Sequence, residues 1–105
     1  MASIEPRYDV VWPRSARGVQ QRPRADRLGG LDGTRVAFVW DHLFRGDEIF
    51  PVLDAELRRR FPGIEIVDHE EFGNTHGADE AEVLAGLPDA LARRHVDAVV
   101  SGMGC

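Results

Sequence analysis

Beyond residue 33 the chain is divided into short apolar runs and longer segments in which apolar residues recur at helical spacing. The run RVAFVW at 35–40 has five consecutive apolar residues, which is typical of a strand buried on both faces of a parallel sheet. Shorter runs at 64–67 and 97–101 predict a second and a third strand.

A first helix is predicted between these strands, at residues 47–61. Apolar residues recur there about every four positions and form one stripe, which comprises Ile49, Phe50, Leu53, Leu57 and Phe61. Pro51 would clash inside a helix, so we expect regular helix to begin near Phe50 with the proline in its first turn. The dipeptide Pro62-Gly63 then ends it.

A second helix is predicted to begin after Asp79, which has the spacing of a capping box with Glu82. Gly86 and Pro88 weaken this helix midway and favour a kink. Its apolar face is expected to comprise Val83, Leu84, Leu87 and Leu91.

The order β-α-β-α-β predicts the α/β class, with three parallel strands joined by right-handed crossovers. This is half of a flavodoxin-like or Rossmann-like doubly wound sheet, and it forms an incomplete domain over residues 34–105. Two helices leave part of such a sheet uncovered, so we expect Val99 and Val100 to be poorly covered. Dimerisation, a second polypeptide or further sequence beyond Cys105 would complete the fold.

Residues 1–33 are mostly polar and rich in arginine, and they are predicted to form an N-terminal arm. Its main apolar stretch extends from Tyr8 to Trp12 and allows one short edge strand near Val10. The arm either clamps a partner or a neighbouring subunit, or is a poorly ordered leader.

Composition excludes several classes of function. A length of 105 residues fits one domain, and the net charge of −5 argues against binding to nucleic-acid phosphates or to an anionic membrane. The arm carries six arginines and four acids, whereas the rest carries seven arginines and fourteen acids. All 13 basic residues are arginine, which suggests a GC-rich bacterial genome, and a single cysteine without a long apolar run suggests the cytoplasm. We therefore expect a soluble protein that acts on a small molecule.

Candidate chemistry follows each predicted strand, because open parallel sheets bind ligands beyond the carboxyl ends of their strands. Asp41 is expected to orient a substrate or transfer a proton, with a turn or helix cap as the alternative role. Three further side chains are expected to line the substrate: His42, Asn74 and His76. A metal site that includes His69, Glu70, Glu71 and His76 is less favoured than a solvated loop, because their spacing fits no standard helical metal motif.

The segment Gly102-Met103-Gly104 follows the third strand and matches the start of a phosphate-cradling G-x-G-x-x-G turn. It either binds a nucleotide or anion or is a tight strand-to-helix turn. Cys105 would then lie near the beginning of a following helix, whose dipole favours a thiolate. We therefore consider Cys105 a candidate nucleophile.

Three blocks of sequence resemble the bacterial UGSC-motif (seleno)protein family: DHLFRGDEIFP at 41–51, EEFGNTHG at 70–77 and DAVVSGMGC at 97–105. The resemblance covers roughly residues 20–105. In that family the segment equivalent to 102–105 is followed by selenocysteine-Gly-Ser-Cys. Selenocysteine is encoded by UGA, ordinarily a stop codon, so the resemblance implies a chain truncated just before selenocysteine. There is also a more distant likeness to selenoprotein B, the selenium subunit of glycine reductase.

These observations leave two hypotheses. In the first, the chain is the N-terminal fragment of a selenol or thiol redox protein, inactive as truncated, in which Cys105 is the neighbour of the missing selenocysteine. In the second, it is a short non-catalytic subunit that binds a nucleotide or anion at 102–105 and is completed by a partner chain or a second copy.

Overall fold

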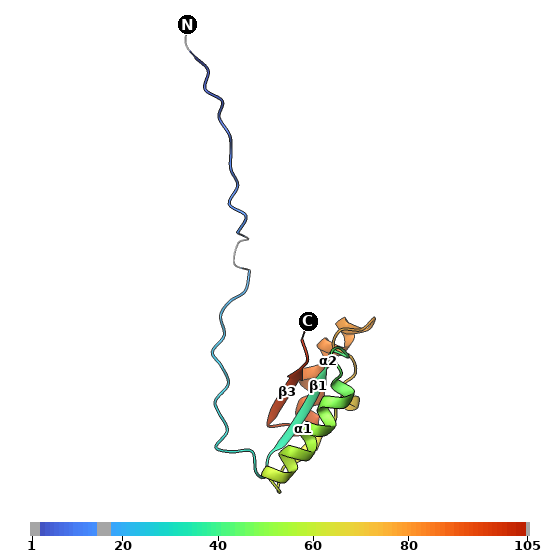
Figure 1. The fold of residues 1–105 in the computed structure, drawn as a ribbon. Coiled ribbons are helices and arrows are strands. Elements are labelled where there is room, and N and C mark those ends of the chain that lie inside the picture. The colour runs from blue at the N-terminus through green and yellow to red at the C-terminus, as the bar shows by residue number, and fades with distance from the viewer. Residues whose placement is uncertain (1–2, 15–17, 105) are drawn as a thin grey trace.

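The structure, a computed structural model, describes residues 3–14 and 18–104 (Figure 1). The strands form one parallel sheet in the order β2-β1-β3, which confirms the predicted three-stranded α/β arrangement. The elements in chain order are β1 (Arg35–Trp40), α1 (Gly46–Arg60), β2 (Glu65–Val67), the 3₁₀ helix η1 (His69–Glu71), α2 (Glu80–Arg93) and β3 (Ala98–Gly102).

The central strand β1 supplies side chains to two apolar clusters, one on each face of the sheet. Val36, Phe38 and Trp40 belong to the cluster that α1 covers, where Leu53 and Leu57 pack against them. On the other face Ala37 and Val39 pack with Phe72 and with three residues of α2, namely Leu87, Ala90 and Leu91. The helices lie on opposite faces because β2 and β3 flank β1 on opposite sides and both crossovers are right-handed.

Strand β3 is covered unequally on its two faces. Val99 pairs with Ala37, so it lies on the face of α2, and 44% of it is exposed. Val100 lies on the other face, where it is half-buried against the cluster beneath α1. The expectation of poor cover is therefore confirmed for Val99, because α2 does not fully cover its face of β3. It is wrong for Val100, because the cluster beneath α1 extends to the other face of β3.

Helix α1 begins at Gly46, one turn earlier than the position of Pro51 suggested. The N–H groups of Glu48 and Ile49 both donate to the carbonyl oxygen of Arg45, each at 3.0 Å, and this closes the first turn. Pro51 consequently lies inside the helix, where it removes one backbone hydrogen bond. Ile49 is 45% exposed, so it does not belong to the buried stripe as predicted.

Helix α2 differs from expectation at its beginning and on its apolar face. Asp79 occupies the N-cap position with φ −102° and ψ 20°, and its side chain makes no capping hydrogen bond. The capping-box prediction is wrong because a capping side chain requires an extended backbone. Leu84 is 46% exposed and Ala90 packs in the core instead, while the helix continues through Gly86 and Pro88.

The described part of the arm, residues 3–14 and 18–30, contains neither helix nor strand and leads away from the sheet (Figure 1). The short strand considered near Val10 is therefore not formed in these residues. Val10 and Val11 are both more than four-fifths exposed. Within the described residues, none of the helices combines the length and the apolar character needed to cross a membrane.

Candidate functional site

The site is built on the loop that follows β1, at the carboxyl edge of the sheet. The Asp41 N–H donates to the carbonyl oxygen of Gly102 at 3.0 Å, which extends the contact between β1 and β3 beyond the strand. Asp41 Oδ1 also accepts a hydrogen bond from the Leu43 N–H at 3.1 Å, forming a local turn. His42, Phe44 and Arg45 then all have positive φ, of 61°, 53° and 56°. Left-handed conformations are costly for such residues and are concentrated at functional sites.

The Asp41 carboxylate is the central contact between this loop and the residues after β3. Its Oδ1 accepts a hydrogen bond from the Met103 N–H and its Oδ2 accepts one from the Gly104 N–H, each at 3.0 Å. The pKa of Asp41 is lowered from its ordinary value, chiefly by the hydrogen bond from Met103, with smaller contributions from the N–H groups of Leu43 and Gly104. The carboxylate is therefore held ionised, with both oxygens engaged by backbone donors.

Gly102 and Gly104 contribute to this turn in different ways. Gly104 has φ 73°, a conformation that glycine adopts without steric cost, so the turn requires glycine there. A Cβ at Gly102 would meet Phe50 Cζ at 3.8 Å, which is ordinary contact. The role of Gly102 lies in its carbonyl oxygen, which accepts the hydrogen bond from Asp41.

An aromatic group around Trp40 holds the loop from the other side. The Trp40 indole Nε1 donates to the carbonyl oxygen of Leu43 at 2.9 Å, and the His42 ring stacks on the indole with centroids 4.3 Å apart. The indole also lies against Gly46, where a Cβ would come within 2.3 Å of Trp40 Cε2. Glycine at position 46 is therefore needed for the close approach of α1 to Trp40.

His69 is a member of this group that sequence reasoning assigned to a loop or a metal site. Its ring centroid lies 5.0 Å from that of Trp40 and 5.8 Å from that of Phe50. The side chain is only 16% exposed, Nε2 lies 3.6 Å from Asp68 Oδ1, and Nδ1 is buried with no hydrogen-bond partner among the described residues. Nothing in the spacing of the sequence distinguishes His69 from its exposed neighbour Glu70, so the sequence carried no signal of this burial.

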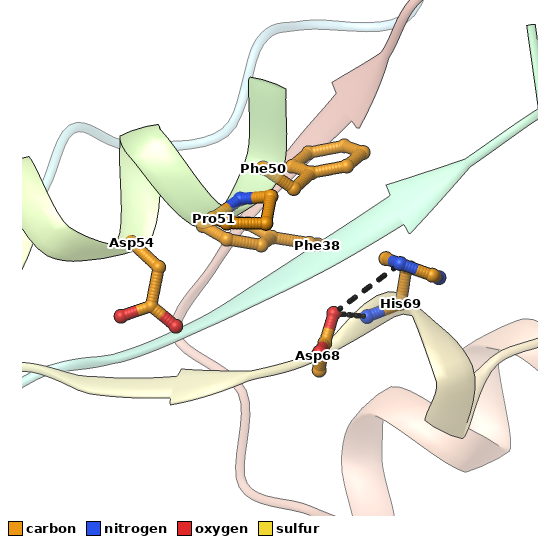
Figure 2. A pocket seen from close by; sticks show the side chains of 6 residues that line it. All are labelled: Phe38, Phe50, Pro51, Asp54, Asp68 and His69. Atoms are coloured by element: carbon orange, nitrogen blue, oxygen red, sulfur yellow. Dashed lines mark hydrogen bonds and ion pairs between the residues drawn. The ribbon is translucent and has the colours of Figure 1, made fainter. Parts of the chain in front are cut away.

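A cavity of about 140 Å³ lies beside His69, between α1 and the ends of β1 and β2 (Figure 2). Figure 2 shows Asp68 next to the histidine ring and Asp54 entering from α1. The lining residues are Phe38, Phe50, Pro51, Asp54, Asp68 and His69.

Asn74 and His76 lie on the loop between η1 and α2. Asn74 forms an isolated parallel bridge with Trp40, so its backbone lies beside the end of β1 as predicted for the candidate site. Its side-chain Oδ1 accepts a hydrogen bond from the His76 N–H at 2.9 Å and is thus used within its own loop. The exposed His76 ring lies beside α2, with Nδ1 3.9 Å from Glu80 Oε2. The substrate-binding roles of His42, Asn74 and His76 stay predictions.

Two other candidates were considered at this edge of the sheet, namely Cys105 as a nucleophile and a metal site. Cys105 lies outside the described residues. In residues 3–14 and 18–104, no three histidine, cysteine, aspartate or glutamate side chains gather in a group suited to a metal ion. Glu71, one of the acids considered for metal, is instead paired with Arg94 at 3.0 Å.

The model of the UGSC family matches residues 9–105. The chain belongs to the UGSC family. The UGSC match covers the Asp41 loop, the His69 region and the turn after β3, and it includes residues of the arm that precede the part expected from the resemblance. No curated protein and no solved structure gives a significant match, so the likeness to selenoprotein B stays a prediction.

Proposed function

We propose that this UGSC-family chain is the N-terminal part of a cytoplasmic bacterial redox protein that uses a selenol or thiol on a small-molecule substrate. In this proposal Asp41 fixes the turn that carries Cys105 and the residue after it. The observation that supports it most is the pair of hydrogen bonds from the Met103 and Gly104 N–H groups to the Asp41 carboxylate. They would hold the backbone immediately before the reactive selenium or sulfur atom.

Of the roles predicted for Asp41, that of a residue that holds a turn is favoured over proton transfer. A general acid or base works best when its pKa lies near the operating pH. The hydrogen bonds from Met103 and Leu43 lower the pKa of Asp41, and the Gly104 N–H engages the second oxygen. Asp41 is thus a poor proton carrier and a good anchor, and we assign it as a positioning residue.

The alternative, a nucleotide or anion bound at 102–105, is less favoured. Such a site needs backbone N–H groups that point at the ligand and are free to donate. In the turn, the Met103 and Gly104 N–H groups already donate to Asp41. An incoming phosphate would have to displace a carboxylate and would meet its negative charge.

The proposed chemistry uses a selenol or thiol and a resolving thiol, which the family motif would supply after Cys105. The selenolate attacks an electrophilic atom of the substrate, so that a bond from selenium to this atom forms while the atom's bond to a leaving group breaks, and the leaving group takes a proton. The resolving thiolate then attacks selenium and breaks the bond between selenium and the substrate atom, which takes a second proton. The substrate has then gained two electrons and two protons, and the pair is left as a selenenyl sulfide that an external dithiol reduces. Cys105 is then the neighbour of the reactive residue, and residues 1–105 alone are expected to be inactive.

The proposal is tested by alkylation of the chain that contains the complete motif, followed by mass spectrometry. At mildly acidic pH a selenol or a low-pKa thiol is ionised and reacts with iodoacetamide, whereas an ordinary thiol reacts slowly. We expect rapid labelling at the residue after Cys105, with the isotope pattern of selenium where selenocysteine is present. Asp41→Ala should slow the labelling, and Asp89→Ala on the exposed side of α2 serves as the control. Equal rates in the two variants would argue against positioning by Asp41.

A further inference from the structure

We propose that the apolar N-terminal segment Tyr8–Trp12 of one molecule docks on the outer face of α1 in a second copy of the chain. The two copies would exchange these segments reciprocally and form a closed dimer. This inference concerns assembly and does not depend on the proposed redox function.

The segment places four apolar side chains within five residues and leaves all four exposed. Tyr8, Val10, Val11 and Trp12 are between 74% and 89% exposed. Contiguous exposed apolar residues of this size commonly mark an interaction surface. The UGSC match begins at residue 9, so most of the segment belongs to the sequence that characterises the family. Family membership of the segment favours a docking element over an incidental leader.

The outer face of α1 has a shallow apolar groove of about 520 Å³, which is largely open to solvent and lined by residues of α1 alone. Val52 is 70% exposed and Ile49 45% exposed, although both lie in a helix whose opposite side is well packed. The groove is lined by Glu48, Ile49, Val52, Leu53 and Glu56, which we call the α1 groove.

The two surfaces carry complementary charge. Arg7 and Arg14 flank the apolar segment, and Glu48 borders the α1 groove. Glu56 also borders the groove, but its carboxylate is already paired with Arg59 and Arg60, so the complementary charge rests on Glu48. The Glu48 side chain is 66% exposed, and its ion pair with Arg45 is long at 3.6 Å, so the Glu48 carboxylate is accessible to an incoming arginine. The same complementarity extends to the whole chain, because the arm carries an excess of arginine and the α/β part an excess of acids.

The course of the arm favours docking between molecules over docking within one. Figure 1 shows the arm leaving at the amino-terminal end of β1 and leading away from its own α1. The α1 groove spans residues 48–56, in the middle of α1. A segment directed away from its own helix can reach the same helix of a two-fold related copy.

The test is a complementation experiment by analytical ultracentrifugation over a concentration series. We expect a concentration-dependent dimer whose dissociation constant rises at least about tenfold with Trp12→Ala and with Val52→Asp. Leu84→Asp, on the exposed side of α2, is the matched control and should leave the constant unchanged. All three positions are exposed, and circular dichroism verifies that each variant folds.

Mixing the Trp12→Ala and Val52→Asp variants tests whether the segment of one copy contacts the α1 groove of the other. A heterodimer keeps one intact contact, so the mixture should dimerise more tightly than either variant alone. A monomer at every concentration, or a dimer insensitive to Trp12→Ala, would overturn the proposal. The proposal would also be overturned if the NMR resonance of the Trp12 indole showed that the ring is buried in the monomer, because the segment would then dock within its own molecule. Loss of the dimer in a chain extended beyond Cys105 would show that later residues fill the groove, which also contradicts it.

Discussion

The Asp41 carboxylate accepts a hydrogen bond from the backbone N–H of Met103, 62 residues later in the chain, at 3.0 Å. This contact joins the loop after β1 to the turn after β3, and the Gly104 N–H strengthens it by donating to the other oxygen. Since the pKa of Asp41 is lowered chiefly by this hydrogen bond, the carboxylate and the turn stabilise one another.

Replacement of Asp41 should release the turn while the sheet stays folded. In Asp41→Ala both acceptors are lost, and in Asp41→Asn one oxygen is kept and the charge is lost. We expect amide hydrogen exchange at Met103 and Gly104 to accelerate on the order of tenfold in the alanine variant, with a smaller effect in the asparagine variant. Exchange in β1 should stay slow, and unchanged exchange at both glycine-turn amides would show that the carboxylate is not their partner.

The same contact predicts a pH dependence. A carboxyl group whose pKa is lowered by folding stabilises the native state above its unfolded pKa, and this stabilisation is lost as the pH falls through the folded pKa. The chemical shifts of the Met103 and Gly104 amides should therefore be constant near neutral pH and change in acid with a midpoint below the ordinary pKa of aspartate. Asp41→Asn should abolish this change. A midpoint above the ordinary aspartate pKa would contradict the structure.

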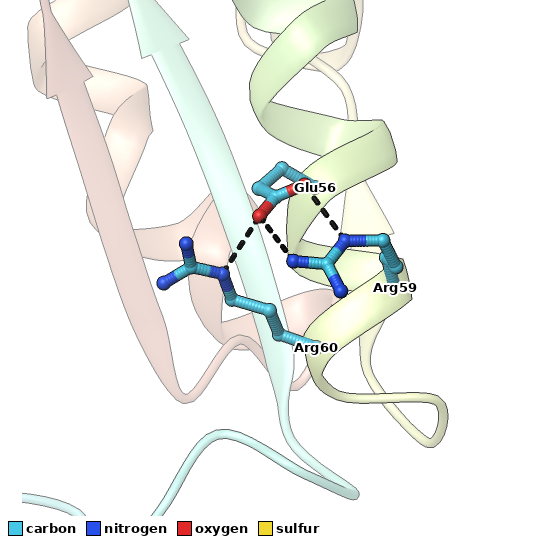
Figure 3. Close-up of polar contacts among 3 residues, drawn as sticks. All are labelled: Glu56, Arg59 and Arg60. Atoms are coloured by element: carbon cyan, nitrogen blue, oxygen red, sulfur yellow. Dashed lines mark hydrogen bonds and ion pairs between the residues drawn. The ribbon is translucent and has the colours of Figure 1, made fainter.

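Glu56 provides a second acid-sensitive contact, on the surface of α1. Its carboxylate pairs with Arg59 at 2.7 Å and with Arg60 at 2.8 Å (Figure 3). The hydrogen bond from Arg59, followed by that from Arg60, lowers the pKa of Glu56 to about 2. The stabilising contribution is present above pH 4.5 and is lost as the pH falls toward about 2.

The measurement for Glu56 compares the free energy of unfolding of the wild type and Glu56→Gln between neutral and acid pH. The difference between the two proteins should be largest at neutral pH and shrink in acid. It should also shrink at high salt, because the pairs are exposed and screened. A difference that grows as the pH falls would have the wrong sign for this account.

Gly46→Ala should destabilise the protein because its Cβ would come within 2.3 Å of Trp40 Cε2. Relief of this overlap requires α1 or the indole to move, and we expect a loss of about 1–3 kcal/mol. Gly86→Ala in α2 is the matched control, since a Cβ there meets nothing within 4 Å and should stabilise the helix by about 0.5–1 kcal/mol. Urea denaturation of both variants measures the contrast, and equal effects would show that Trp40 does not require glycine at position 46.

His69→Phe tests the unpaired Nδ1 next to Trp40. The phenyl ring preserves the aromatic contacts with Trp40 and Phe50 and removes a buried polar atom that has no partner among the described residues. We expect the free energy of unfolding to be unchanged or to rise by up to about 1 kcal/mol. A loss of more than about 2 kcal/mol would mean that the His69 ring makes a polar contact essential to the fold.

Much of the fold could be predicted from hydrophobic periodicity. The pattern of apolar positions indicates strand β1 and most of the buried face of each helix. The errors arose where tertiary contacts override local preference. Pro51 is tolerated inside α1 because the left-handed turn at Arg45 and the contact of Gly46 with Trp40 begin the helix earlier. Ile49 and Leu84 are apolar but exposed, since helical spacing alone does not show where a stripe ends.

Part of the candidate site could also be predicted, from the positions of residues after the predicted strands. The rule that ligands bind beyond the carboxyl ends of parallel strands led to Asp41, Gly102 and Gly104, and the structure brings these three together. The sequence could not show that Asp41 bonds to the N–H groups of the turn, because that contact depends on the pairing of β1 with β3. The burial of His69 was missed because it depends on the packing of α1 and Trp40 around η1.

The central claim, that a selenol or thiol redox residue follows the turn anchored by Asp41, is tested most directly by the codon that follows Cys105 in the gene. The account predicts UGA at this position, with the reading frame continuing into Gly-Ser-Cys. A codon for cysteine followed by the same three residues would keep the thiol form of the proposal. Any other codon, or a frame that does not continue after UGA, would contradict it.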